Sequence, residues 1–116
     1  MSNDKLTVER SSGSREHHVV LTCKGPFTIQ TLFTFQGVVR ELNGSGAVLV
    51  DFSQVPYMDS AGLGALVGAF ISSRHANRKV VLVGVSERVA ALIRMSNLEQ
   101  FFPMYASRVE AEVALP

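Results

Sequence analysis

The residues that could carry chemistry in this 116-residue chain are one serine beside an aspartate, three histidines and a single cysteine. Ser60 lies in the run Asp59-Ser60-Ala61-Gly62, which differs from the G-x-S-x-G turn that presents the nucleophile of α/β-hydrolases. A hydrolytic serine also needs a base within hydrogen-bonding reach, and no motif places a histidine beside Ser60. We therefore expect that this protein is not an enzyme.

The histidines and the cysteine lack the spacing of a metal site. His17 and His18 are neighbours on an expected strand, where successive side chains point to opposite faces, and His75 stands apart from both. We expect all three histidines at the surface. Cys23 is the only cysteine, which excludes an internal disulfide and a zinc framework of paired cysteines. These features imply no metal, no cofactor and a reducing, cytoplasmic location.

The charge balance argues against nucleic acid as a direct partner. Eleven Lys and Arg against ten Asp and Glu give a net charge of +1, which supplies no field for gripping a polyanion. The densest basic group, Arg74, Arg78 and Lys79, is interpreted as serving a helix end or facing water, with a partner contact as the alternative. Gly44-Ser45-Gly46 precedes a strand rather than a helix, so we interpret it as a turn rather than a phosphate loop.

Length and composition indicate one soluble domain over residues 1–116, with residues 1–4 flexible. Apolar residues make up 47% of the chain and charged residues 18%, which favours a packed core over disorder. The first ten residues hold no apolar stretch of the kind found in secretory signals. The longest uncharged runs fall short of the roughly 20 apolar residues of a membrane span, so we expect no membrane insertion.

The pattern of apolar residues predicts a sheet with an N-terminal hairpin. Residues 6–10 and 17–23 alternate as strands around a Ser-Gly turn cluster. Ala47–Val50 and Val80–Val83 are continuous apolar runs, typical of central strands covered on both faces, and a helical pattern separates them. The predicted fold class is therefore α/β: a mixed sheet with an N-terminal hairpin and parallel central strands, packed against about four helices.

The first predicted helix follows the break at Gly25 and Pro26. Thr28 is expected to cap it, and Asn43 to Gly46 are expected to end it. Its buried stripe is predicted to consist of Ile29, Leu32, Phe33, Phe35, Val38, Val39 and Leu42.

Two more helices and a short strand are predicted in the last third of the chain. Ser86 and Glu87 suit a helix start, and Asn97 suits a left-handed terminator. A short strand is expected over Phe102–Tyr105. Ser107 followed by Glu110 matches a capping box that opens a last helix through Val109 and Val113.

The helix between the two central strands has two contrasting faces. Large side chains form one face, and Ala61, Gly64, Ala65 and Gly68 form a second stripe of small residues. Each interior glycine costs about 1 kcal/mol relative to alanine, so Gly64 and Gly68 indicate that another surface approaches closely. A neighbouring helix of the domain and a partner protein both fit. The large residues are Leu63, Leu66, Val67, Phe70 and Ile71.

Ser60 stands at or beside the start of this helix, where two roles are open. Serine is a common N-cap, and capping is the favoured interpretation from the physics of the residue alone. The unpaired N–H groups and the positive end of the helix dipole also favour an anion there. A phosphate on Ser60 would add roughly two negative charges and would disturb an apolar docking surface beside it.

Two segments resemble the signature of the STAS domain, as found in bacterial anti-sigma factor antagonists. They are Val48-Leu49-Val50-Asp51-Phe52-Ser53 and Tyr57-Met58-Asp59-Ser60-Ala61-Gly62-Leu63-Gly64. The resemblance continues through residues 79–85 and 89–104, including Phe-Phe-Pro, so it covers nearly the whole chain. It implies a STAS-like fold, in agreement with the predicted order of elements.

The resemblance implies a switch rather than an enzyme. Members bind an anti-sigma factor, often an ATP-dependent serine kinase, and so release a sigma factor for transcription. The serine after Met-Asp is the phosphorylated residue in that family and corresponds to Ser60; phosphorylation weakens partner binding, and a serine phosphatase restores it. The expected partner-binding residues are Asp59, Ser60, Ala61, Gly62, Gly64, Ala65, Gly68 and Thr28.

One segment departs from the family pattern. Many members carry Gly-Glu-Leu-Asp before the first helix, whereas this chain has Gly25-Pro26-Phe27-Thr28 and lacks both acidic residues. Such a chain could bind a different kinase or act as a constitutive adaptor. The alternative function is therefore a STAS adaptor subunit of a membrane lipid or anion transport complex, or of a stress-signalling scaffold.

Overall fold

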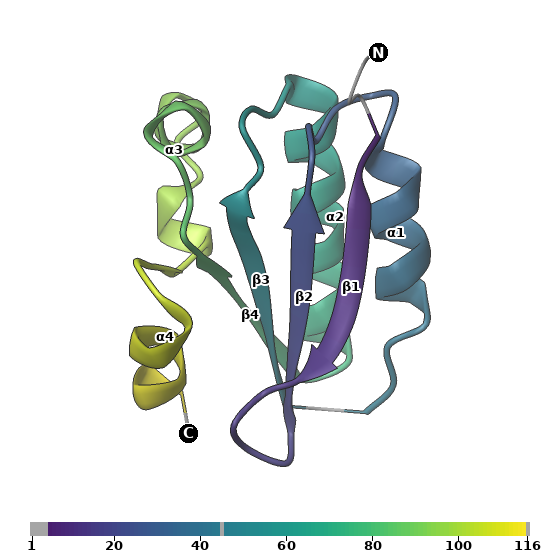
Figure 1. Cartoon of the computed structure of the whole chain (residues 1–116), viewed down its shortest axis with the longest axis vertical. Helices are drawn as coiled ribbons and strands as arrows, with labels where there is room; N and C mark the ends of the chain where they lie inside the picture. Colours follow the sequence, from purple (N-terminus) through teal and green to yellow (C-terminus); the bar gives the residue numbers. More distant parts are fainter. Residues whose placement is uncertain (1–4, 45, 116) are drawn as a thin grey trace.

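A five-stranded mixed sheet forms the centre of the computed structural model, which describes residues 5–44 and 46–115 (Figure 1). The strands follow the order of the sequence across the sheet, and β1 pairs antiparallel with β2 while every later pair is parallel. The predicted α/β fold with an N-terminal hairpin and parallel central strands is confirmed. The strands are β1 (Thr7–Ser12), β2 (His18–Lys24), β3 (Gly46–Gln54), β4 (Arg78–Val83) and β5 (Met104–Tyr105).

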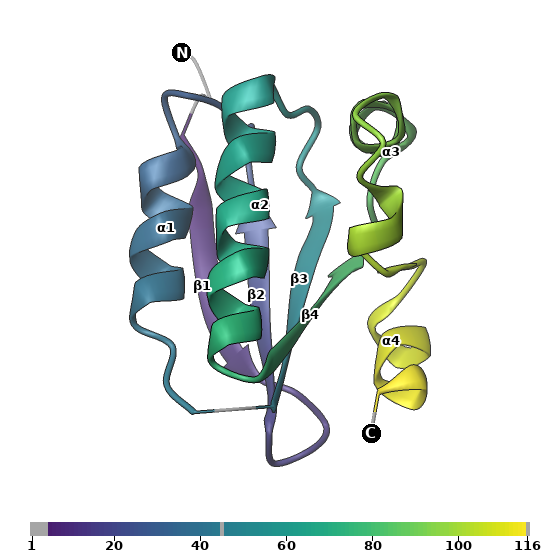
Figure 2. The same ribbon diagram turned by 180° about the vertical axis from the view of Figure 1, so that it is seen from behind.

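Helices cover both faces of this sheet. α1 and α2 lie side by side on one face (Figure 2), as expected when right-handed crossovers join successive parallel strands. α4 follows the last strand and packs on the opposite face. The helices among the described residues are α1 (Leu32–Arg40), α2 (Ser60–His75), α3 (Glu87–Met95), the 3-10 turn η1 (Glu99–Phe101) and α4 (Arg108–Ala114). The flexibility predicted for residues 1–4, and Ser45 of the predicted turn, lie outside the described residues.

Two apolar clusters, one on each face, form the core. In the larger cluster the ring of Phe27 contacts the rings of Phe35 and Phe52, with centroids 5.0 and 5.2 Å apart. The smaller cluster lies between the sheet and α4. Because both faces are covered, β3 and β4 are apolar almost throughout, as their continuous runs predict. The smaller cluster consists of Val20, Ala47, Leu49, Val81, Val83, Ala111 and Leu115.

The start of α1 differs from the prediction. The helix begins at Leu32, so Thr28 does not cap it. Instead, Thr31 Oγ1 accepts a hydrogen bond from Thr28 N (2.9 Å) and donates one to Pro26 O (2.8 Å). The competing side-chain bonds of Thr31 hold the preceding residues in ordered turns rather than in the helix.

Several predicted core positions lie at the surface. Ile29 and Phe33 are 58% and 69% exposed, so the buried stripe of α1 does not include them. Ile29 precedes the helix, and Phe33 lies about 100° around the helix from buried Leu32. Val109 and Val113 on α4 are also exposed, because α4 turns other residues toward the sheet.

The caps of the last two helices are confirmed. Ser86 accepts a hydrogen bond from Val89 N, and Ser107 accepts one from Glu110 N. Asn97 has φ +59°, the left-handed conformation expected of a helix terminator.

A partly buried charged contact joins the start of α4 to the sheet. Arg108 donates from Nε to Asp51 Oδ2 (2.9 Å) and from Nη2 to Thr22 Oγ1 (2.8 Å). Ser53 donates to Asp51 Oδ1 from N (2.9 Å) and from Oγ (2.7 Å). Burial alone would raise the pKa of Asp51, but the hydrogen bonds from Ser53 and Arg108 outweigh it and hold that pKa below its ordinary value.

A histidine makes the second contact with α4. The prediction that His18 lies at the surface is wrong, since it is 3% exposed with Nδ1 2.8 Å from Glu112 Oε1. Ser14 N donates to both carboxylate oxygens of Glu112. The bond with His18 and then those with Ser14 lower the pKa of Glu112, against the opposing effect of partial burial. His17 and His75 are exposed, as predicted.

Asp51→Asn should destabilise the domain and change its response to acid. Losing this charge-assisted contact, in which Arg108 is exposed to solvent, should reduce the free energy of unfolding at neutral pH by roughly 0.5–1.5 kcal/mol. Because the pKa of Asp51 is lower in the folded state, its stabilisation is present above the unfolded pKa and is lost as the pH falls below about 4. Urea unfolding of wild type and variant across acidic pH measures both effects.

The matched control is Glu16→Gln, at an exposed acidic position. It should leave the free energy of unfolding nearly unchanged. If Asp51→Asn unfolds at the same urea concentration as wild type at every pH, the fastening role of Asp51 is wrong.

Candidate partner-binding site

The carboxylate of Asp59 joins two connections at one end of the sheet. Asp59 is the N-cap of α2, and its Oδ1 accepts a hydrogen bond from Gly62 N at 2.8 Å. Its Oδ2 accepts from Ile29 N at 3.1 Å, in the turns that precede α1. The favoured prediction that Ser60 caps this helix is therefore wrong, because Asp59 occupies the capping position.

Backbone contacts reinforce this junction. Phe27 and Met58 form a parallel bridge outside the named strands. Phe27 N donates to Tyr57 O (3.1 Å), and Asp59 N donates to Phe27 O (3.2 Å). These bonds and the two accepted by the Asp59 carboxylate fix the turns before α1 against the start of α2.

Gly62 is required by the same junction. A Cβ built on Gly62 would lie 2.2 Å from Phe27 O and 2.7 Å from the Phe27 ring. Gly62 is buried within the domain, so a partner cannot reach it directly. Its predicted place in the docking surface is corrected to a structural role beneath that surface.

Ser60 is the first residue of α2 and is exposed. Its hydroxyl makes no hydrogen bond with any residue in the part of the chain that the structure describes. Because Asp59 performs the capping, the hydroxyl of Ser60 is left accessible at the positive end of the helix dipole.

The predicted stripe of small residues divides into an inner and an outer part. Ala65 is buried, and Ala61 is half-buried against the larger core cluster. Gly64 and Gly68 are exposed, and a Cβ added to either would meet nothing within 4 Å. Gly68 lines a groove of about 280 Å³ between α1 and α2. The neighbouring helix α1 accounts for Ala65 but leaves Gly64 and Gly68 open to solvent.

Ile29 and Phe33 belong to the predicted buried stripe of the first helix, but both are exposed apolar residues. Ile29 is tied to Asp59 through its N–H, and Phe33 lies in the first turn of α1. Phe33 follows buried Leu32, and neighbouring residues of a helix point about 100° apart. This spacing could have indicated that Phe33 is exposed. A depression of about 360 Å³ adjoins Ile29 and is lined by Pro26, Thr28, Ile29, Gln30, Tyr57 and Asp59.

Cys23 lies in the core of the domain rather than at this site. Cys23 is buried, and burial followed by the charge of Asp51 raises its pKa to about 12, so the thiol stays protonated. No three His, Cys, Asp or Glu side chains among residues 5–44 and 46–115 come together as metal ligands. No helix in those ranges has the length and apolar character to span a membrane.

The fold is a small α/β domain with an exposed serine at the start of a helix, and the comparisons name its family. The STAS domain family model matches residues 10–111, and the chain belongs to the STAS domain family. The anti-sigma-B factor antagonist of Listeria monocytogenes is 41% identical over 69 residues. That match spans 59% of this chain and 59% of the length of the Listeria protein.

Solved structures share the fold. An anti-sigma factor antagonist from Mycobacterium paratuberculosis superposes with a TM-score of 0.79 at 19% identity, covering 98% of this chain and 97% of that one. The Bacillus cell fate determinant SpoIIAA, in its phosphorylated form, gives a TM-score of 0.67 at 12% identity, covering 92% and 98%. At these identities the likeness concerns the fold alone.

Two glycine substitutions on α2 should have opposite effects on stability. Gly62→Ala should cost roughly 1–3 kcal/mol because its methyl group would collide with the backbone of Phe27. Gly64→Ala should add up to about 1 kcal/mol, since the new methyl group meets open space and alanine favours the helix. Urea unfolding of both variants gives the comparison, and equal effects on stability would contradict the close approach at Gly62.

Proposed function

We propose that this protein is an anti-sigma factor antagonist whose partner binding is switched by phosphorylation of Ser60. One observation carries the proposal: Asp59 caps α2 and leaves the neighbouring Ser60 hydroxyl exposed beside an apolar surface. The names of the Listeria and Mycobacterium proteins support the class of activity. SpoIIAA, solved in a phosphorylated form, supports the kind of modification.

The proposed docking surface consists of Ile29, Phe33, Ser60, Gly64 and Gly68. Ser60, Gly64 and Gly68 follow one another at intervals of four residues, so they lie along one side of α2. Without side chains, the two glycines allow a partner to approach the helix backbone closely. Ile29 and Phe33 add apolar area that becomes buried on binding. Five further predicted residues would support this surface: Gly62 and Ala65 are buried, and Thr28, Asp59 and Ala61 are half-buried.

Phosphorylation would act on this surface through charge. A phosphate carries about two negative charges at neutral pH and would need to stay hydrated. Gly62 N is bonded to Asp59 Oδ1, and Leu63 N to Asp59 O, so the N–H groups of Ser60 and Ala61 are left to hold the phosphate on the protein's own helix. Burying the phosphate against an apolar partner would then carry a desolvation cost, and affinity would fall.

The partner expected for a switch at Ser60 is an anti-sigma factor that is also an ATP-dependent serine kinase. Binding of the unphosphorylated chain would release a sigma factor for transcription in the cytoplasm, and a serine phosphatase would restore the binding form. The segment Gly25-Pro26-Phe27-Thr28 brings no acidic side chain to this surface, so the kinase would recognise Ile29 and α2 rather than a charged loop.

A pull-down from native lysate with Ser60→Ala and Ser60→Glu baits tests the switch. Ser60→Ala should retain an anti-sigma factor, identified by mass spectrometry. Ser60→Glu should retain at least about tenfold less of it, equivalent to roughly 1.4 kcal/mol of binding free energy.

The matched control is Ser12→Glu, which adds the same charge at an exposed position on β1. Ser12 pairs with Val19 at the start of β2, at the opposite end of the sheet from α2's first turn. This control should bind as well as wild type. Equal retention by both Ser60 baits would contradict the switch, and retention of a transporter subunit by both would support the adaptor function instead.

A further inference from the structure

The edge of the sheet at β4 is only partly covered. β4 pairs with β3 over residues 78–83, but it pairs with β5 only at Leu82 and Val83. Residues 78–81 therefore form an edge without a further strand partner in the described part of the chain, on which Lys79 is exposed and Arg78 half-buried, while Val80 and Val81 are 4% and 0% exposed. Open edges of this kind can pair with an additional strand.

The backbone groups of Val80 point to this open side. Leu82 N donates to Pro103 O and Gly84 N donates to Tyr105 O, both at 2.9 Å, so these N–H groups face β5. Successive residues of a strand alternate, so the N–H and C=O groups of Val80 face the same side. The next hydrogen bond between β5 and β4 would need an N–H from residue 103. That residue is Pro103, which has no N–H to donate. Within the described residues, the Val80 backbone groups find no partner on this side.

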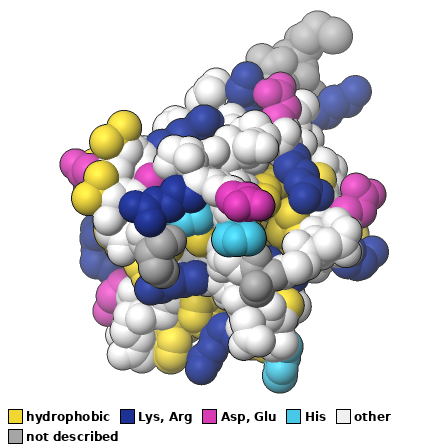
Figure 3. Space-filling view, turned by 90° about the horizontal axis from the view of Figure 1, so that it is seen from below, with side chains coloured by type: hydrophobic (Ala, Val, Ile, Leu, Met, Phe, Trp, Pro, Cys, Tyr) yellow, Lys and Arg dark blue, Asp and Glu magenta, His cyan; other side chains and the backbone are white. Residues whose placement is uncertain are grey.

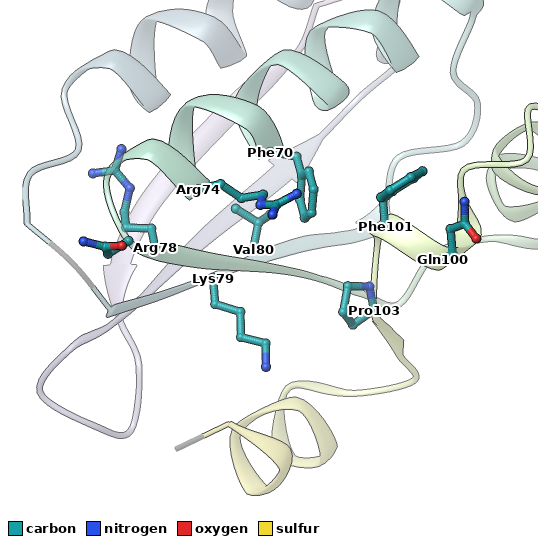
Figure 4. Close-up of a pocket in the computed structure, with 9 residues that line it drawn as sticks. Phe70, Arg74, Arg78, Lys79, Val80, Gln100, Phe101 and Pro103 are labelled. Carbon is teal, nitrogen blue, oxygen red and sulfur yellow. The ribbon is translucent and has the colours of Figure 1, made fainter.

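A cleft follows the same edge. It has a volume of about 540 Å³, and Figure 4 shows Phe70 and Arg74 of α2 on one side of β4 and Lys79 on the other. A smaller apolar pocket of about 170 Å³ shares Phe70, Arg74 and Phe101 with the cleft. The residues lining the larger cleft are Phe70, Arg74, Asn77, Arg78, Lys79, Val80, Gln100, Phe101 and Pro103.

The larger cleft is lined by three basic side chains and by no acidic side chain. Arg78 is already hydrogen-bonded to the connection between α1 and β3, because its Nη1 donates to Leu42 O and Gly44 O at 3.2 Å. Arg74, which lies over the Phe70 ring at 5.9 Å, and exposed Lys79 are left for a ligand. Figure 3, seen from the end where α2 finishes, shows Lys and Arg side chains spread over this end among hydrophobic, acidic and histidine side chains.

We propose that the β4 edge binds an extended acidic segment of a partner protein, which adds as a strand beside residues 78–81. Its backbone pairs with Val80, its apolar side chains contact Phe70 and Phe101, and its alternate acidic side chains face Lys79. A second copy of this chain is a poor occupant, because two copies would bring their own Arg74 and Lys79 cations together. Arg74 is about 21 Å along α2 from Ser60, so this proposal does not rest on the phosphorylation switch.

The test uses a fluorescein-labelled peptide of sequence Glu-Val-Glu-Leu-Glu-Val with the full chain. Fluorescence anisotropy should show saturable binding that weakens with added salt. Amide hydrogen exchange of Val80 should slow by at least about tenfold when the peptide is bound, because its N–H gains a partner. Lys79→Glu should lower the affinity at least about fivefold through charge repulsion.

Four controls make the test specific. Arg10→Glu makes the same change of charge on β1, the opposite edge strand, and should bind the peptide as wild type does. A peptide with Lys in place of Glu, and one N-methylated at its central amide, should both bind much more weakly. Ser60→Glu should bind the acidic peptide normally, which separates this proposal from the switch.

The proposal is overturned if no saturable binding occurs or if Val80 stays unprotected at saturation. Equal binding of the lysine or N-methylated peptide would also overturn it, because charge or backbone pairing would then be irrelevant. Protection of Val80 that rises with protein concentration in the absence of peptide would assign the edge to a second copy of this chain instead.

Discussion

The capping of α2 by Asp59 is the interaction on which the arrangement of the candidate site depends. One carboxylate satisfies an N–H at the start of α2 and another in the turns before α1. With the bridge between Phe27 and Met58, it holds two segments distant in sequence in a fixed relation. The same interaction frees Ser60 from capping. Because Asp59 supplies the acceptor that the first N–H groups of a helix require, the hydroxyl of Ser60 remains exposed at the start of α2.

The two ends of α2 present different surfaces. At its start, the surface consists of small and apolar residues, and Ser60 lies at the edge of it. At its end, cations from α2 and β4 surround an open sheet edge. α4 covers the other face of the sheet and is fastened through Asp51 and His18, so neither surface is blocked by it. The proposed switch site and the proposed site for an extended acidic segment therefore lie at opposite ends of α2.

Much of the fold was predictable because its strongest signals are local. The continuous apolar runs of β3 and β4 require coverage on both faces, and Ser86 and Ser107 are efficient caps in their own right. The failures came from contacts that the residue pattern does not reveal. Thr31 bonds locally to Thr28 and Pro26, and α1 begins after it rather than at Thr28. Buried His18 contacts Glu112 of α4, which is distant in sequence. Aspartate and serine both suit a capping position, and the carboxylate of Asp59 also bonds to Ile29, thirty residues away.

The most direct test of the switch compares the binding of phosphorylated and unphosphorylated chains. Protein carrying phosphoserine at position 60 and unmodified protein would each be titrated with the purified anti-sigma factor by isothermal titration calorimetry. The account predicts at least about tenfold weaker binding of the phosphorylated chain, or roughly 1.4 kcal/mol. Equal dissociation constants for the two forms would contradict it.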